Sequence, residues 1–220
     1  MTNSMCTTMF LVAMLLALTN TASAQFGVGW MKIPEIVVVG RADDPRQSLV
    51  DEAVDFWNKM LAELGSPFRL GKVTRHAGVV PGAQLERMSD LVVEAYRRPN
   101  LTLPDSISSV PGDLFVVLGD TEFVSFAAPF VADHRRMVGI RGNSFSPMNL
   151  PNVARNVIAH EMGHAIGLSH NSDETSLMCG RPSPCRPGLF RSKEAKMFPL
   201  TDQERRDLLA IYPSNWAPNR

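Results

Sequence analysis

The chain has 220 residues, of which 45% are hydrophobic, and its 22 basic and 22 acidic side chains give a formal net charge of zero. This balance excludes a polyelectrolyte tail, a disordered acidic segment and a generally basic protein that binds nucleic acid. The length suits one domain with a core of its own. Because the apolar runs fall short of the roughly eighteen residues that a membrane-spanning helix needs, we expect no such helix.

The N-terminal segment has the pattern of an export signal. Residues 9–18 form an apolar block that is too short to span a bilayer, and the small residues Ala22 and Ala24 follow it. We therefore expect a signal peptide over residues 1–24, with cleavage after Ala24, and a protein that is secreted or periplasmic. A buried N-terminal helix is the alternative, since residues 1–8 contain no Lys or Arg.

Two of the three cysteines, Cys179 and Cys185, lie in the expected mature chain, 25–220. An even number of cysteines in an exported protein favours a disulfide, and two prolines restrict the short loop between them. We therefore expect a Cys179–Cys185 bridge that fixes a local shape and stabilises the fold by ~2 kcal/mol. A pair of free thiols is the alternative.

The mature chain predicts a single domain that contains both strands and helices. Short β-branched or apolar runs predict strands at 35–41, 68–80, 114–118, 124–131 and 137–141. Apolar residues at three- and four-residue spacing predict helices at 45–64, 85–95, 151–168 and 202–212. The segment 180–198 is rich in Pro and Arg without a period, which predicts a loop.

Several residues predict where the helices begin and end. Asp44 and Pro45 suit the N-cap and the first position of the first helix, and Gly65 suits its C-terminal cap. Thr201 and Glu204 have the spacing of a capping box, which predicts the start of the last helix.

The residues with chemical potential are concentrated in one short segment. His160 and His164 are four residues apart on a predicted helix, which places both imidazoles on one face. Two rings so placed can share one zinc ion, with bonds of about 2.0–2.1 Å. Glu161 borders this face, where it can act as a base on a water molecule at the ion.

The residues that follow predict a third ligand. Gly167 can take a positive φ that ends the helix and turns the chain, so His170 can fold back to the same ion. Three imidazoles leave a fourth zinc position open to water, as in catalytic sites, whereas a structural zinc is closed by a fourth protein ligand. The pair of histidines with Glu161 is only suggestive by itself, but Gly167 and His170 in register make the motif specific.

The other two histidines, His76 and His134, are isolated in the sequence and are interpreted as surface residues. Arg135 and Arg136 fall in a predicted polar turn and are interpreted as solvated. We therefore expect one catalytic Zn²⁺ and no nucleic-acid partner. A calcium ion is compatible with the sequence, but no Gly- and Asp-rich loop supports one.

The segment HEMGHAIGLSH resembles the long zinc signature of the metzincin metallopeptidases, and the positions of Asp173 and Met178 after it resemble the matrixin branch. Two positions depart from the matrixin pattern: Asn171 replaces the usual Ser, and Cys179-Gly180 stands where Tyr-Pro is common. The resemblance implies that Asp173 supports the turn at His170 and that Met178 forms an apolar floor under the imidazoles.

The resemblance also implies the architecture of a metzincin catalytic domain. This is an α+β fold with a twisted, mostly parallel sheet of about five strands and three main helices. The zinc cleft would lie between a larger N-terminal subdomain, 25–170, and a small C-terminal subdomain, 171–220. An extended peptide could pair with the strand at 124–131, and the loop at 179–198 would shape the pocket after the scissile bond.

The implied function is that of a secreted zinc endopeptidase. A water activated by zinc would attack the peptide bond, with Glu161 as the general base. We expect a monomer that acts on a peptide or protein substrate. One alternative is a non-catalytic secreted binding protein on the same scaffold, although such a protein would not need Glu161. A zinc hydrolase that acts on a non-protein amide is the other.

Overall fold

The computed structural model describes residues 29–94, 101–129, 134–180, 185, 192 and 194–219. The predicted signal peptide and most of the predicted loop at 180–198 lie outside the described residues. Within the described part of the chain, no helix is long and apolar enough to cross a membrane.

Strands and helices follow one another largely in the predicted order. In sequence they are β1 (Ile36–Gly40), α1 (Gln47–Glu63), β2 (Val73–Ala77), α2 (Gly82–Glu94), α3 (Asp105–Ser108), β3 (Leu114–Leu118), β4 (Phe126–Pro129), β5 (Arg136–Ile140), α4 (Pro151–Ala165) and α5 (Asp202–Ile211). The sequence does not predict α3, because a single helical turn is too short to show a periodic apolar stripe.

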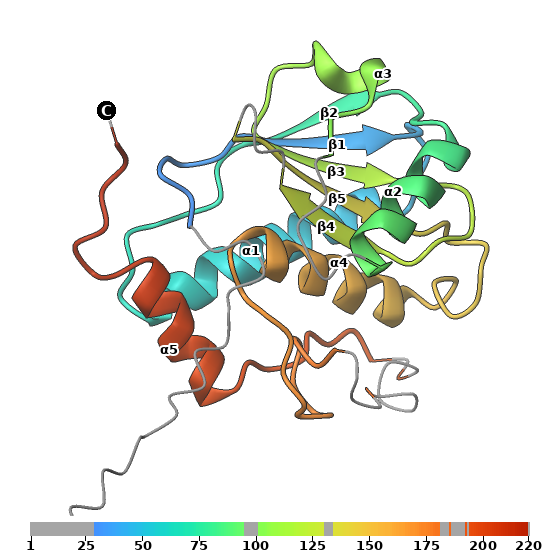
Figure 1. Ribbon diagram of the computed structural model, residues 1–220. Helices are drawn as coiled ribbons and strands as arrows, with labels where there is room; N and C mark the ends of the chain where they lie inside the picture. Colours follow the sequence, from blue (N-terminus) through green and yellow to red (C-terminus); the bar gives the residue numbers. More distant parts are fainter. Residues whose placement is uncertain are drawn as a thin grey trace, which may run out of the picture.

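The strands form one five-stranded sheet in the order β2-β1-β3-β5-β4 (Figure 1). The first four of these run parallel, and β4 pairs antiparallel with β5 at the edge of the sheet. β1, β3 and β5 are buried along their whole length, as expected for central parallel strands covered on both faces. The predicted α+β class and the mostly parallel sheet are thus confirmed.

Helices cover both faces of this sheet. α1 and α4 lie beneath it in Figure 1, pack on each other, and form one core with alternate strand residues such as Val38 and Val116. α2 and α3 cover the opposite face, where Leu85 and Ile107 belong to a second core. α5 adds Leu208 to the first core. The sheet edge at β4 therefore lies beside α4, the helix that carries the histidines.

The start of α1 differs from the prediction. The helix begins at Gln47 rather than after an Asp44 N-cap. The Asp44 carboxylate instead accepts a hydrogen bond from the backbone N–H of Arg46 and pairs with its guanidinium, which also donates to the carbonyls of Gly119 and Arg141. Because the guanidinium of Arg46 is buried, it needs this carboxylate and delays the start of the helix.

The other predicted helix ends agree better with the structure. Gly65 follows α1 with a φ of +78°, and Thr201 and Glu204 form a reciprocal capping box at α5. α4 ends at Ala165, three residues before the predicted end at Leu168, because Gly167 has a φ of +111°.

Arg136 corrects a second prediction, because it lies in β5 and is only 8% exposed rather than solvated. Its guanidinium lies 4.3 Å from the ring centroid of Trp30 and donates to the carbonyl of Ala165. The indole of Trp30 donates to the same carbonyl, and the hydroxyl of Tyr212 donates to the carbonyl of Ile166. These side chains satisfy carbonyls at the end of α4 that a helix leaves unpaired.

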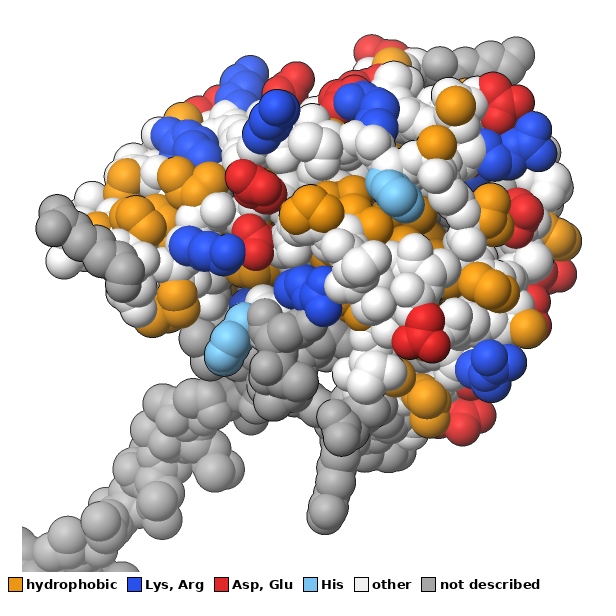
Figure 2. Space-filling view, turned by 90° about the horizontal axis from the view of Figure 1, so that it is seen from above, with side chains coloured by type: hydrophobic (Ala, Val, Ile, Leu, Met, Phe, Trp, Pro, Cys, Tyr) orange, Lys and Arg blue, Asp and Glu red, His pale blue; other side chains and the backbone are white. Residues whose placement is uncertain are grey.

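Basic and acidic side chains are interspersed over the face of the molecule that Figure 2 shows. This distribution is the one expected of a chain with equal numbers of the two charges.

Candidate metal centre

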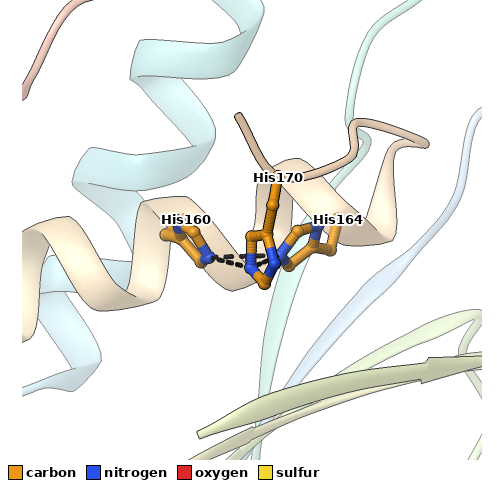
Figure 3. Close-up of side chains that lie close together, drawn as sticks. All are labelled: His160, His164 and His170. Atoms are coloured by element: carbon orange, nitrogen blue, oxygen red, sulfur yellow. Dashed lines mark hydrogen bonds between the residues drawn. The ribbon is translucent and has the colours of Figure 1, made fainter. Parts of the chain in front are cut away.

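The structure brings the three histidines of the motif together. His160 and His164 project from α4, and His170 reaches them from the segment after the helix (Figure 3). The Nε2 atom of His160 lies 3.1 Å from that of His164 and 3.1 Å from that of His170, and the last two atoms are 2.9 Å apart. The other two histidines do not join this cluster.

The local backbone explains this convergence. One helical turn separates His160 from His164, so their rings lie on the same face of α4. Beyond the helix, Gly167 takes its positive φ, and the N–H of Leu168 bonds back to the carbonyl of Gly163 at 3.0 Å. This reversal returns the chain toward the helix and brings His170 within reach of the other two rings.

Backbone carbonyls fix the orientation of two of the rings. The Nδ1 atom of His160 lies 2.8 Å from the carbonyl oxygen of Leu177, and that of His164 lies 2.7 Å from the carbonyl oxygen of Leu168. Since a carbonyl only accepts, each Nδ1 carries the proton and each Nε2 keeps its lone pair for the shared point. Such outer hydrogen bonds are typical of histidines that bind metals.

The surroundings favour neutral imidazoles. Burial lowers the pKa of His164 well below its ordinary value, and the neighbouring His160 and His170 lower it further. His170 is the most exposed of the three, yet partial burial lowers its pKa as well. The neutral ring is the form that binds a metal. Three neutral imidazoles aimed at one point fit zinc, whose bonds to nitrogen are about 2.0–2.1 Å long.

Glu161 lines the same cavity as the three histidines, which has a volume of about 580 Å³. Its side chain is buried, and burial raises the pKa of the carboxyl to about 8. A cation held by the histidines would act in the opposite direction, because a nearby positive charge favours the carboxylate. Glu161 is thus placed beside the point where the three nitrogens meet.

The segment 171–180, here called the His170 loop, is tied to α5 by a polar network. The amide of Asn171 donates to the hydroxyl of Ser176 at 2.6 Å and to the carboxylate of Glu204. Glu204 is 4% exposed and also accepts from the backbone N–H and the hydroxyl of Thr201. The backbone of Asn171 bonds to Met178 and to Gly180, which closes the loop on itself.

Asp173 and Met178, the two predicted supports of the site, lie in this loop. The carboxylate of Asp173 accepts from the backbone N–H and the hydroxyl of Thr175 at 2.9 and 2.7 Å, so it shapes the turn at the tip. Met178 is fully buried against α4, where a Cβ on Gly163 would overlap its sulfur. Met178 therefore packs on the helix next to His164.

The predicted disulfide joins Cys179 to Cys185, with a Cα–Cα distance of 5.7 Å. Cys185 and Gly180 both line the cavity. The Cα of Gly180 faces the ring of His170 so closely that a Cβ there would overlap the imidazole. The disulfide and Gly180 thus form the wall of the cavity at the third ligand.

The sequence does not predict the contacts that three residues make near the site. Asn171 stands out only as a departure from the matrixin pattern, and Glu204 only as part of a capping box. Nothing in the sequence links these two residues, which are far apart in the chain. Gly180 likewise stands out only as part of the departure at Cys179-Gly180, because a glycine in a Pro-rich stretch indicates a loop and not a contact with a ring.

The part of the chain that contains the metal centre matches a known protein family. Residues 132–204, a third of the chain, match the model of the matrixin peptidase family. The match contains the three clustered histidines, Glu161, Met178 and the two cysteines of the disulfide. This part of the chain is therefore similar to the matrixins, and the three histidines within it could hold a metal ion. No curated protein sequence matches the chain.

The solved structures that are similar to this chain include the following three. Archaemetzincin from Methanopyrus kandleri has a TM-score of 0.49 and 16% identity over 82% of this chain and 96% of its own. Metalloproteinase-II from Bacteroides fragilis has a TM-score of 0.47 and 14% identity over 84% and 54% of the two chains. A zinc-dependent peptidase from Methanocorpusculum labreanum has a TM-score of 0.36 and 16% identity over 79% and 99%.

Proposed function

We propose that this protein is a secreted zinc endopeptidase. The observation that carries the proposal is the convergence of three imidazole nitrogens, 2.9 to 3.1 Å apart, beside a buried carboxylate in one cavity. His160, His164 and His170 would hold the ion. When bound, zinc supplies a Lewis acid that polarises a carbonyl and lowers the pKa of water.

Glu161 is the proposed general base. Its carboxylate takes a proton from water as the water oxygen bonds to the carbonyl carbon of the scissile peptide. The same proton then passes to the nitrogen of the leaving amine as the carbon–nitrogen bond breaks. Glu161 ends the cycle as a carboxylate, and the products are a carboxylic acid and an amine.

The edge strand β4 would bind the substrate backbone. The backbone N–H of Arg136 donates to the carbonyl of Asp113, which directly precedes β3. Successive peptide groups of a strand point in opposite directions, so those of Met137 point toward β4, where Met137 pairs with Ala128. By alternation, the peptide groups of Ser125 and Ala127 face away from the sheet, and both residues line the cavity. An extended peptide can therefore add a strand here. Antiparallel addition is favoured because that ladder is the more stable.

Export is the remaining part of the proposal. The apolar segment and small residues before Gln25 support a signal peptide. The Cys179–Cys185 disulfide supports the same location, since such bonds persist mainly in oxidising compartments. The monomeric state stays a prediction, and a calcium ion stays compatible with the sequence without support from it.

The test is cleavage of a mixed peptide library by the zinc-loaded chain from Gln25 onward, read by mass spectrometry. Glu161→Gln should lower the rate by about 10²–10⁴-fold at unchanged zinc content, because it keeps the shape and removes the base. Glu174→Gln, a matched change at an exposed acid of the His170 loop, should cleave as the parent does. A chelator should stop all cleavage.

The other outcomes are equally informative. A folded, zinc-loaded parent that cuts no peptide would overturn the proposal and favour the binding-protein reading or a non-protein amide substrate. Equal cleavage by the parent and by Glu161→Gln would mean that Glu161 is not the base.

A further inference from the structure

The reversal of the chain at the end of α4 orients two of the three metal ligands at once. The chain leaves the helix through Gly167, and His170 follows three residues later. Leu168 lies within the same reversal, and its carbonyl oxygen is 2.7 Å from Nδ1 of His164. A rotation of the peptide groups after Ala165 would therefore turn the ring of His164 and displace His170 together. Whatever holds these peptide groups sets the geometry of the metal centre.

Backbone hydrogen bonds account for only part of this reversal. The three N–H groups that follow Ala165 bond to carbonyls of the preceding turn. The carbonyl of Ala165 itself accepts from two side chains, the indole of Trp30 at 2.9 Å and the guanidinium of Arg136 at 2.5 Å. Because Ala165 is fully buried, leaving this carbonyl without a donor would be costly. The orientation of its peptide group thus depends on side chains that are distant in the sequence.

Arg136 is the charged donor of the pair. Hydrogen bonds from ionised donors are stronger than those between neutral groups, and a cation at the C-terminal end of a helix interacts favourably with the helix dipole. The guanidinium lies 4.3 Å from the ring centroid of Trp30, and Arg136 is 8% exposed, so water competes little for its donors. The indole therefore holds the guanidinium in place against the end of α4.

The backbone of Arg136 connects this contact to the sheet. Arg136 is the first residue of β5, where it pairs with Leu114 of β3 and with Pro129 of β4. β4 is the edge strand that we propose for the substrate backbone. One residue therefore joins the strand next to the proposed substrate to the end of the helix that orients the ligands, and its side chain fixes the position of one relative to the other.

We propose that Arg136 is a positioning residue of the metal centre. Its guanidinium fixes the peptide group of Ala165, and through this group it sets the orientation of His164 and the place of His170. Arg136 does not line the cavity, so it acts through the end of α4 and not by contact with a substrate. The inference rests on the proposed function, because it concerns the same metal centre.

The experiment measures zinc affinity by competition with a chelating dye, and the visible absorption of the protein loaded with Co²⁺, which reports ligand geometry. Arg136→Met keeps the length of the side chain and removes its donors, so zinc affinity should fall on the order of tenfold and the Co²⁺ absorption should change. Arg136→Lys keeps the charge without the planar group and should lie between the two. Arg135→Met is the matched control, because Arg135 donates to the carbonyl of Ser108 in α3, which covers the opposite face of the sheet from α4.

A purely structural role gives a different result. Arg136→Met would then unfold more easily, but the folded protein would keep the zinc affinity and the Co²⁺ absorption of the parent, and this outcome would overturn the inference. The same changes in Arg135→Met would overturn it as well. If Arg136→Met does not fold, Arg136→Lys decides: weaker zinc binding with an altered absorption supports the inference, and parent-like values overturn it.

The failure of this inference and that of the proposed function are distinguishable. If the parent binds neither metal, the proposed function fails and this inference fails with it. If the parent binds zinc and cleaves peptides in a Glu161-dependent way, while the Arg136 variants bind both metals as the parent does, only the role of Arg136 fails.

Discussion

The two halves of the metal centre are built in different ways. His160 and His164 are placed by a regular helix, α4. Its backbone hydrogen bonds join residues close in sequence, and its apolar residues pack in the core. His170 is placed by the His170 loop, which has little regular structure and depends on Asn171 and Glu204. The helix half needs only correct spacing, whereas the loop half needs specific polar partners from a distant part of the chain.

The variant with the largest expected effect disrupts the loop half of the metal centre. Glu204→Ala would leave the amide of Asn171, the hydroxyl of Ser176 and the N–H of Thr201 without their shared acceptor. We expect a loss of about 3 kcal/mol in the free energy of unfolding, from buried unpaired donors at about 1–3 kcal/mol and a lost cap at about 1 kcal/mol. Urea unfolding of the zinc-free protein measures it.

The same variant should also bind zinc more weakly, because the network holds the loop that directly follows His170. Gln203→Ala, an exposed change on the same helix, serves as the control and should stay within about 0.5 kcal/mol of the parent. A loss below about 1 kcal/mol for Glu204→Ala would show that the loop holds its shape without this carboxylate.

A smaller effect separates metal binding from stability. Gly180→Ala places a Cβ into the ring of His170, so the ring must move away from the other two ligands. We expect zinc affinity to fall about 10–100-fold, as for other changes next to a ligand, and the zinc-free protein to stay folded. Competition with a chelating dye gives the affinity. Gly78→Ala, beside the non-ligand His76, should leave it unchanged.

The same contrast explains how much of the molecule could be predicted. The strands, the zinc helix and the capping box at Thr201 depend on short-range patterns, and the structure has them within a few residues of the predicted bounds. The spacing in His160, His164 and His170 likewise sufficed to bring three rings together. These features are local, so a single sequence contains the information for them.

The errors arise where a side chain finds a distant partner. Arg136 is predicted to be solvated because its sequence neighbours are polar. In the structure it is buried against the ring of Trp30, a residue more than a hundred positions earlier in the chain. Asp44 is predicted as a cap, but it pairs with the buried Arg46 instead. Such contacts depend on the assembled core, and no periodicity in the sequence reports them.

The smallest expected effect tests the helix half. Tyr212 is buried and donates to the carbonyl of Ile166 at the end of α4, and burial raises the pKa of its hydroxyl to about 12. Because the folded pKa exceeds the unfolded value of about 10, this contribution to stability is complete below pH 10 and is lost as the pH rises through 12.

At pH 11, one unit above the unfolded pKa, the parent should lose about 1.4 kcal/mol of unfolding free energy relative to pH 8. Tyr212→Phe lacks the ionising group, so it should be less stable than the parent at pH 8 but should not show this additional loss. The measurement is urea unfolding of both proteins at the two pH values, without metal. Equal pH dependence in the two proteins would mean that Tyr212 does not hold the end of α4 as a neutral donor, and the helix half would then lose one of the contacts that distinguish it from the loop half.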